Sequence, residues 1–401
     1  MIARKNLRKN FLLPTLVLAL VIPTHAHALP KPVAVKQLAK WSDATGIELF
    51  ASTNKSVITV KNLLATSADI EIQARDFAGA VLWSKTIDSG LDEVATAIAP
   101  DGQGNIWLAG NSAVPATVET GTAGQSGLNP DGVIAEAPAQ TRPDMRLLTI
   151  WKINPAGEIQ DKYTLLQNDL PLVDAIAISA TGISILASRE SGAVVISANP
   201  KGIFGKEIKI GSNKTKLSSI VRSSDGSINV FGSSTEILGG KKLVGREDGV
   251  LIKISKTGAV SSVVRSSTPK GYRNWSSATP TLCLSGSVKV GKVIETAITK
   301  FTNSFTPTWT TRIPSSGSAL AVNGSSGSCY VALEPTAAIK GLSNFKIAKG
   351  QNLVIQLDSK GAINSALTSA ELIQVKAITY SVAGGLFILT ENAIFTAGAA
   401  K

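Results

Sequence analysis

Apolar and polar residues alternate in short runs along almost the whole chain, and two kinds of run recur. One is a turn followed by an alternating strand, as at 101–110 (DGQGNIWLAG) and 225–232 (DGSINVFG). The other is a strand, a glycine turn and a second strand, as at 249–260 and 352–363. Alternation with a period of two predicts β-strands, and the Asp, Asn and Gly residues between them predict tight turns.

The spacing of these runs predicts a β-propeller. They return at intervals of about 50 residues, and each interval holds four short strands. Four strands alone do not bury their own faces, so each sheet has to stack on its neighbours, and radial stacking closes a ring. A β-solenoid is the alternative fold, although repeat spacings from about 45 to about 78 residues suit its regular coils less well.

Counting the runs gives seven inner halves and six outer halves. Inner hairpins are expected near residues 44–60, 93–110, 173–187, 217–232, 275–286, 318–333 and 375–390. The turns of the outer halves are expected at Gly79, Gly157, Gly202, Gly258 and Gly361, and at 303–305, where the glycine is missing. We therefore predict an all-β fold, a single seven-bladed β-propeller over residues 29–401. The last blade lacks an outer strand, and residues 33–35 (VAV) are expected to complete it.

The first 28 residues predict an export signal. Four basic residues between positions 4 and 9 precede an apolar stretch at 11–23, and Ala-His-Ala at 26–28 is a small-residue cleavage site. The apolar stretch is too short for a spanning helix, which needs about 20 residues. We expect cleavage, no transmembrane segment in the mature chain, and a location outside the cell or on the exterior of the cell envelope. A signal retained as an anchor is the alternative.

Cleavage would remove both histidines of the chain, His25 and His27. A chain without His excludes Ser-His-Asp and Cys-His catalysis and every His-containing metal site. The sequence has no phosphate-binding loop, dinucleotide fingerprint or zinc spacing, and β-turns explain its Asp-Gly pairs better than calcium loops do. We therefore expect no metal and no cofactor.

Positive charge is concentrated in one part of the chain. Without the signal the formal net charge is +8, from 36 Lys and Arg against 28 Asp and Glu. Residues 201–300 alone carry 17 Lys and Arg against 6 Asp and Glu, so one side of the molecule is expected to be basic. This pattern is typical of a solvated face or of a site for a polyanion, and no motif indicates specific nucleic-acid binding.

Residues 79–87 (GAVLWSKTI), the acidic pair Asp92-Glu93 and the run at 101–110 resemble the secreted bacterial β-propeller repeat known as SBBP. In that family a glycine, two apolar residues, Trp, Lys and Thr end one blade, and an acidic pair with a turn-plus-glycine strand opens the next. The resemblance is strongest over 70–110 and weaker at 217–262, and later blades lack most marker residues. It implies the propeller fold, export and a bacterial source. It implies no catalytic residues, because the family shares none.

Loops between the second and third strands of a blade share one face of a propeller with the loops between blades. Three such loops are long, at 111–145, 233–248 and 334–350, and long loops on rigid scaffolds concentrate binding residues. The cations of the second and third loops are candidate binding residues for an anion: Lys241, Lys242, Arg246, Lys340, Lys346 and Lys349. Lysines that serve only as solvated charge are the alternative interpretation.

These features predict an exported, non-enzymatic scaffold whose long-looped face binds a partner, either an envelope protein or an anionic surface polymer. The alternative is a carboxylate-dependent polysaccharide hydrolase or lyase at the channel mouth. Asp92, Glu93 and Asp174 lie at or before innermost strands, and two carboxylates suffice for glycoside hydrolysis. Only 5% of the residues are aromatic, so no sugar-stacking platform is evident.

Cys283 and Cys329 are the only cysteines, and an exported chain permits their oxidation. When the strands are aligned on Gly232 and Gly286, period-two alternation places the two thiols on opposite sheet faces of neighbouring blades. Two neighbouring blades can then turn them toward each other. A disulfide is one interpretation, and two buried free thiols are the other.

Overall fold

The computed structural model describes residues 32–64, 67–115, 142 and 144–398. The expected export signal at 1–28 and most of the long loop at 111–145 lie outside these residues. Within the described part, no helix is long and apolar enough to cross a membrane. Among the described residues the regular structure consists of strands and one 3-10 turn, η1 (Ser325–Gly327).

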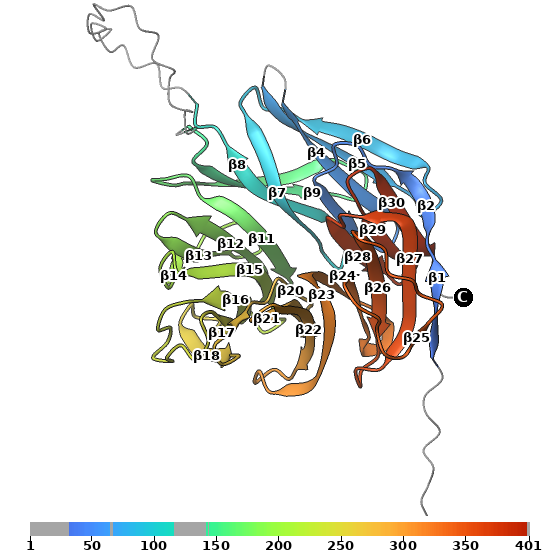
Figure 1. The fold of residues 1–401 in the computed structure, drawn as a ribbon. Coiled ribbons are helices and arrows are strands. Elements are labelled where there is room, and N and C mark those ends of the chain that lie inside the picture. The colour runs from blue at the N-terminus through green and yellow to red at the C-terminus, as the bar shows by residue number, and fades with distance from the viewer. Residues whose placement is uncertain (1–31, 65–66, 116–141, 143, 399–401) are drawn as a thin grey trace, which may run out of the picture. The chain divides into compact units, whose positions relative to one another are not determined.

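Five antiparallel sheets of four strands each make up most of the β-propeller (Figure 1). In four of them the strands follow one another in the sequence. The first blade contains β3 (Leu49–Ser52), β4 (Val57–Leu64), β5 (Ala68–Arg75) and β6 (Val81–Ile87). The second contains β7 (Glu93–Pro100), β8 (Ile106–Ser112), β9 (Leu147–Ile153) and β10 (Ile159–Leu166). The third contains β11 (Leu172–Ser179), β12 (Gly182–Arg189), β13 (Gly192–Ala198) and β14 (Ile208–Ile210). The fourth contains β15 (Thr215–Arg222), β16 (Ile228–Ser234), β17 (Asp248–Ile254) and β18 (Val260–Ser266).

The remaining strands form the last blade and a ten-stranded sheet. The last blade contains β28 (Ala377–Ser381), β29 (Gly385–Leu389), β30 (Ala393–Gly398) and β2 (Ala39–Asp43). The ten-stranded sheet contains β19 (Tyr272–Arg273), β20 (Ser277–Ala278), β21 (Cys283–Val290), β22 (Val293–Phe301), β23 (Pro307–Asn323), β24 (Cys329–Pro335), β25 (Leu342–Ser343), β26 (Gln351–Leu357), β27 (Ile363–Ile373) and β1 (Val33–Gln37).

The predicted count of seven blades is not confirmed, because only five four-stranded blades are separate. The physical reason is β23, which runs for 17 residues without a break. Its first part, at 307–314, pairs with β22, and its second part, at 315–323, pairs with β24. The inner hairpin expected at 318–333 requires a new blade to begin near residue 318, whereas the structure has a shift of register there and one continuous strand.

The N-terminal segment closes the ring, but with other residues than those expected. The fourth strand of the last blade is β2, which pairs antiparallel with β30. Residues 33–35 lie in β1, which pairs in parallel with β27 and β25 of the ten-stranded sheet (Figure 1). The difference follows from Trp41 in β2: its ring packs edge-on against Phe387 at 5.3 Å, and its indole N–H donates to the Phe77 carbonyl oxygen at 3.0 Å.

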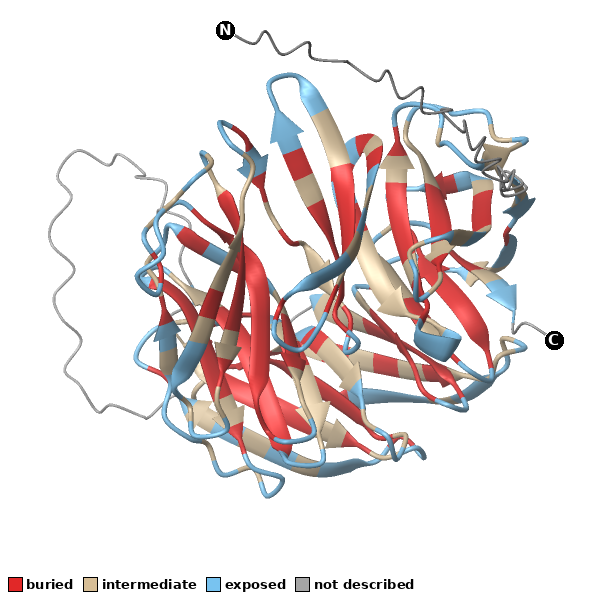
Figure 2. Cartoon of the chain, turned by 90° about the horizontal axis from the view of Figure 1, so that it is seen from below, coloured by how far each residue is buried: buried red, intermediate tan, exposed pale blue. Residues whose placement is uncertain are grey.

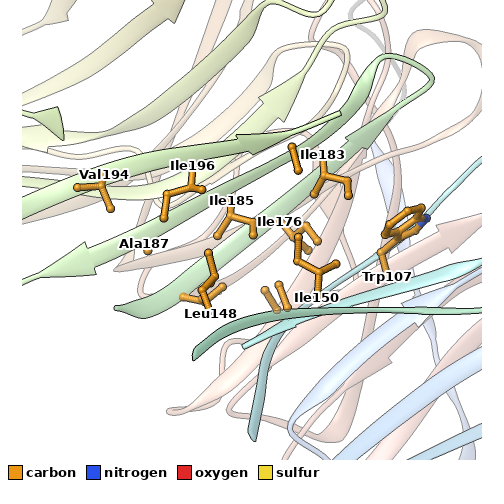
Figure 3. Packing of buried hydrophobic residues seen from close by; sticks show 13 residues of the cluster. Trp107, Leu148, Ile150, Ile176, Ile183, Ile185, Ala187, Val194 and Ile196 are labelled. Carbon is orange, nitrogen blue, oxygen red and sulfur yellow. The ribbon is translucent and has the colours of Figure 1, made fainter. Parts of the chain in front are cut away.

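The hydrophobic core lies between the sheets. The buried apolar residues of the described part form seven clusters, and most of them join two successive sheets. Figure 3 shows the cluster in which Leu148 and Ile150 of the second blade face Ile185 of the third. Because both faces of a blade are covered, long stretches of strand are buried, which Figure 2 shows in red. In β8 every residue is buried. Between the last and first blades, the Thr379 and Ser52 hydroxyls hydrogen-bond at 2.7 Å beside the seventh cluster.

A second contact repeats along the outer strands: an aromatic side chain covers the turn glycine of the next outer hairpin. Trp83 of β6 lies on Gly157 and donates its indole N–H to the Pro155 carbonyl oxygen at 2.9 Å. Trp309 of β23 makes the same contact with Gly361, donating to the Ser359 carbonyl oxygen at 3.0 Å.

Trp41 and Tyr163 cover Gly79 and Gly202 in the same way, and aliphatic Ile208 approaches Gly258. All five turn glycines recognised in the sequence have a positive φ, and Gly157, Gly202 and Gly361 also leave room for the neighbouring aromatic ring.

We expect Gly157→Ala to destabilise the protein by about 2 kcal/mol, because φ is +85° there and a methyl group would lie 2.6 Å from the Trp83 ring. Gly102→Ala is the matched control, since Gly102 has no positive φ and nothing within 4 Å of an added methyl group. Urea unfolding of both variants measures the effect. Equal stability of the two variants would contradict the packing role.

Cys283 of β21 and Cys329 of β24 are joined by a disulfide in the structure, with their Cα atoms 6.6 Å apart. Both residues are buried in the cluster between the two parts of the ten-stranded sheet, beside Ile298 and Val331. The bond thus connects strands on either side of β23.

We expect non-reducing peptide mapping of protein from an oxidising compartment to recover the Cys283 and Cys329 peptides as one species. The double variant Cys283→Ser/Cys329→Ser should lose about 2–4 kcal/mol of stability, because the bond closes a loop across 46 positions of sequence. Recovery of two free thiols from such protein would rule out the bond.

Candidate binding site

The long loop between β16 and β17, at 235–247, is held by a buried carboxylate. The Asp248 side chain is fully buried and accepts hydrogen bonds from the backbone N–H groups of Val244 and Gly245, both at 2.9 Å. Arg265 of β18, which is also buried, pairs with Asp248 at 3.4 Å and donates to the Lys241 carbonyl oxygen at 3.1 Å. The loop therefore has a fixed frame despite its length.

Glu236 fixes the start of this loop. Its carboxylate accepts hydrogen bonds from the Ser212 backbone N–H at 2.7 Å and from the Thr215 hydroxyl at 2.6 Å. These hydrogen bonds hold the pKa of Glu236 below its usual range, and the bond from the Ser212 N–H has the largest effect. The loop is thus fastened to the segment that enters the fourth blade.

Three predicted binding residues extend from this frame, and all three are exposed: Lys241, Lys242 and Arg246. The Arg246 guanidinium lies 5.9 Å from the centre of the Tyr272 ring, and a backbone bridge pairs Glu247 with Tyr272. The loop of the fourth blade therefore adjoins the start of the ten-stranded sheet.

The loop between β24 and β26 carries the other three predicted cations, Lys340, Lys346 and Lys349, which are also exposed. Its apolar residues Ile339, Leu342 and Phe345 pack against the core cluster of the ten-stranded sheet. Among the described residues, no hydrogen bond or ion pair joins this loop to the loop at 235–247.

The three carboxylates of the enzyme alternative belong to separate networks. Asp92 accepts a hydrogen bond from the Ala68 N–H at 2.7 Å and forms an ion pair with Arg142. Both contacts lower the pKa of Asp92, and the bond from Ala68 has the larger effect. Fully buried Glu93 is bonded by Ser89 and by Lys162 Nζ at 3.3 Å. The geometry therefore gives Asp92 and Glu93 structural roles.

Asp174 accepts a hydrogen bond from the Ser188 hydroxyl at 2.6 Å, and partial removal from water raises its pKa. A raised pKa suits a general acid, but the described contacts of Asp174 contain no second carboxylate to act with it.

Sequence analysis missed Arg273, a buried arginine at the start of the ten-stranded sheet. No local pattern distinguishes it from the other 16 cations of residues 201–300. Its burial depends on Trp275 and on the neighbouring fourth blade, which become visible only in the folded chain.

A pocket of about 360 Å³ lies between the third and fourth blades, lined in part by Lys206, Arg222 and Lys256. The Arg222 guanidinium donates to the Ser184 hydroxyl at 2.7 Å and to the Thr181 carbonyl oxygen at 3.1 Å. This arginine therefore has neutral acceptors of its own.

No protein-family model matches the chain, and no curated protein matches it. Solved structures do resemble it. A streptogramin B lyase superimposes with a TM-score of 0.50 at 12% identity, over 89% of this chain and 96% of the lyase. The β-propeller domain of the Trilobed protease from Pyrococcus furiosus gives a TM-score of 0.51 at 10% identity, over 90% of this chain and 97% of that domain. The chain has the β-propeller fold. At these identities the likeness extends to the fold alone.

We expect Glu93→Ala to lower the free energy of unfolding by about 2–3 kcal/mol, because it leaves Lys162 and Ser89 without their acceptor. Glu190→Ala, at an exposed position, is the control and should be neutral. Thermal unfolding of both variants measures the difference. Wild-type stability of Glu93→Ala would argue against a structural role for this carboxylate.

Proposed function

We propose that this protein is an exported, non-enzymatic β-propeller scaffold that binds a negatively charged partner, an envelope protein or a surface polymer, through its long-looped face. The observation that carries the proposal is the buried Asp248–Arg265 ion pair together with the hydrogen bonds from Val244 and Gly245 that hold the loop at 235–247. A buried ion pair that fixes a loop keeps its cations at constant positions, so less conformational entropy is lost when a partner binds.

The loop cations have no ion-pair partners among the described residues, which also supports binding. Within the described part of the chain, none of the six predicted binding residues has a carboxylate within ion-pair distance. Unpaired cations on a fixed surface create a positive potential that attracts polyanions. The carboxylate-enzyme alternative has no comparable support, because Asp92 and Glu93 are each occupied by cations.

For the scaffold itself we propose seven structural units, with the ten-stranded sheet counted as two blades that share β23. The contact of Trp309 with Gly361 supports this division, because it repeats the contact between the outer strand of one blade and the turn of the next. The register shift within β23, between Ser315 and Ala319, separates the two ladders.

Export and membership of the SBBP repeat family are parts of the same proposal. They rest on the pattern of the first 28 residues and on the motif at 70–110. Sequencing the N-terminus of protein recovered from the growth medium or the cell surface tests the export step. A retained N-terminal segment in all fractions would contradict it.

Binding is tested with arrays of glycans, polyanions and envelope proteins. Two triple variants remove the candidate residues: Lys241→Gln/Lys242→Gln/Arg246→Gln and Lys340→Gln/Lys346→Gln/Lys349→Gln. We expect at least one of them to weaken binding about tenfold, and we expect wild-type binding to weaken as salt rises. The matched control, Lys201→Gln/Lys206→Gln/Lys256→Gln, removes three exposed charges from outside the two loops and should bind normally. Equal loss in all three variants would indicate attraction by net charge and would overturn the loop-face proposal.

A further inference from the structure

Arg273 of β19 is a buried cation without an anionic partner among the described residues. Its relative exposure is 9%, and its guanidinium lies over the Trp275 ring at 4.4 Å. Its side chain donates no hydrogen bond to any described residue, and the Nε atom is fully enclosed without an acceptor. Burial lowers the pKa of Arg273 to about 10, with a smaller contribution from the positive charge of Arg312, so the guanidinium stays charged at neutral pH.

The other buried arginines of the described part are paired. Arg265 has Asp248 at 3.4 Å, and Arg189 has Glu207 at 2.6 Å together with Asp169. Arg312, whose charge contributes to the lowered pKa of Arg273, is itself paired with Glu295 at 3.4 Å. A buried charge is unfavourable unless it is paired and hydrogen-bonded, and among the described residues Arg273 has no such partner, although the same fold supplies one to the other buried arginines.

Further hydrogen-bond donors lie beside this guanidinium. The Trp275 indole N–H is also enclosed, without an acceptor among the described residues. Gly249 of the fourth blade packs directly against this indole, because a Cβ atom at that position would come within 2.8 Å of the indole nitrogen. The neighbouring residue, Tyr272, points to the other, exposed face of β19, where the Arg246 guanidinium lies over its ring and exposed Lys289 is the cross-strand partner of Tyr272. Two exposed cations therefore lie near this end of β19, on the face opposite to Arg273.

We propose that Arg273 is the anchor of an oxyanion-binding site at the junction of the fourth blade and the ten-stranded sheet. The ligand is a carboxylate or phosphate group on an anionic polymer, since the planar guanidinium fork binds either group through two parallel hydrogen bonds. The site rests on the proposed function, because the adjoining loop at 235–247 supplies Arg246 to hold the rest of the polymer.

Two polyanions distinguish the chemistry of the ligand: polygalacturonate, which presents carboxylates, and polyphosphate, with dextran as the neutral control. Affinity is measured by biolayer interferometry at several salt concentrations. We expect Arg273→Lys, which keeps the charge and loses the fork, to weaken binding of the preferred polymer about tenfold or more. Arg222→Lys is the matched control, because that guanidinium already has acceptors in Ser184 and Thr181, and it should bind as wild type.

A stability measurement separates an anion site from a structural arginine. Without polyanion, we expect Arg273→Met to unfold at the same temperature as the wild type or higher, since it removes an uncompensated buried charge. Inorganic phosphate should raise the unfolding temperature of the wild type and leave that of Arg273→Met unchanged, and the preferred polymer should stabilise Arg273→Met less than the wild type. A lower unfolding temperature of Arg273→Met together with unchanged polymer binding by Arg273→Lys would show that Arg273 only supports packing.

The outcomes also separate this site from the loop-face proposal. If the triple variant of residues 241, 242 and 246 loses binding while Arg273→Lys binds normally, the loop face stands and the Arg273 site is wrong. If neither polymer binds the wild type and phosphate does not stabilise it, the Arg273 site is wrong. The loop face is then left with envelope proteins as partners, and a binding array of such proteins that also detects nothing would overturn it.

Discussion

The contact between one sheet and the next determines this structure, because no blade buries both of its faces alone. Apolar clusters fill the space between sheets, and on the outside an aromatic ring from one sheet covers a turn glycine of the next, as with Trp83 on Gly157. The indole N–H then satisfies a turn carbonyl, so one side chain contributes packing and a hydrogen bond to the same joint. Trp41 makes this joint at the closure, which explains why β2 rather than the apolar run at 33–35 completes the last blade.

Local features of the sequence predicted the hairpins, because alternation and turn glycines act over a few residues. Gly157 and Gly361 are turn residues as expected, with φ of +85° and +84°. The blade count depended on whether a new blade begins before the hairpin expected at 318–333, and contacts with neighbouring strands decide this. The Ser315 hydroxyl hydrogen-bonds to Thr296 at 2.8 Å and accepts from the Gly317 N–H at 3.0 Å, so the strand continues with an irregularity instead of ending there.

The sequence predicted only in part which charged side chains are exposed and which are buried. The loop lysines are exposed as their type suggests, for no neighbouring segment covers them. Asp92 resembled a catalytic residue because its position before an innermost strand was visible, whereas its partners, Ala68 and Arg142, lie 24 and 50 positions away in sequence. Long-range pairing of this kind decides whether a carboxylate is available for chemistry, and it leaves no local signature.

The same reasoning explains why one arginine outweighs many lysines as a candidate for specific recognition. An exposed lysine is already solvated, so an anion gains little by replacing its water, and salt screens the attraction. Arg273 has lost most of that water to Trp275 and the fourth blade without gaining an acceptor among the described residues, so an oxyanion at its guanidinium would satisfy donors that lack a protein partner there. In this proposal the exposed cations bring a polyanion to the surface, and the buried Arg273 guanidinium then binds one carboxylate or phosphate group of it. This division of roles predicts that added salt weakens the attraction of the polymer by the exposed cations far more than the binding of its oxyanion to Arg273.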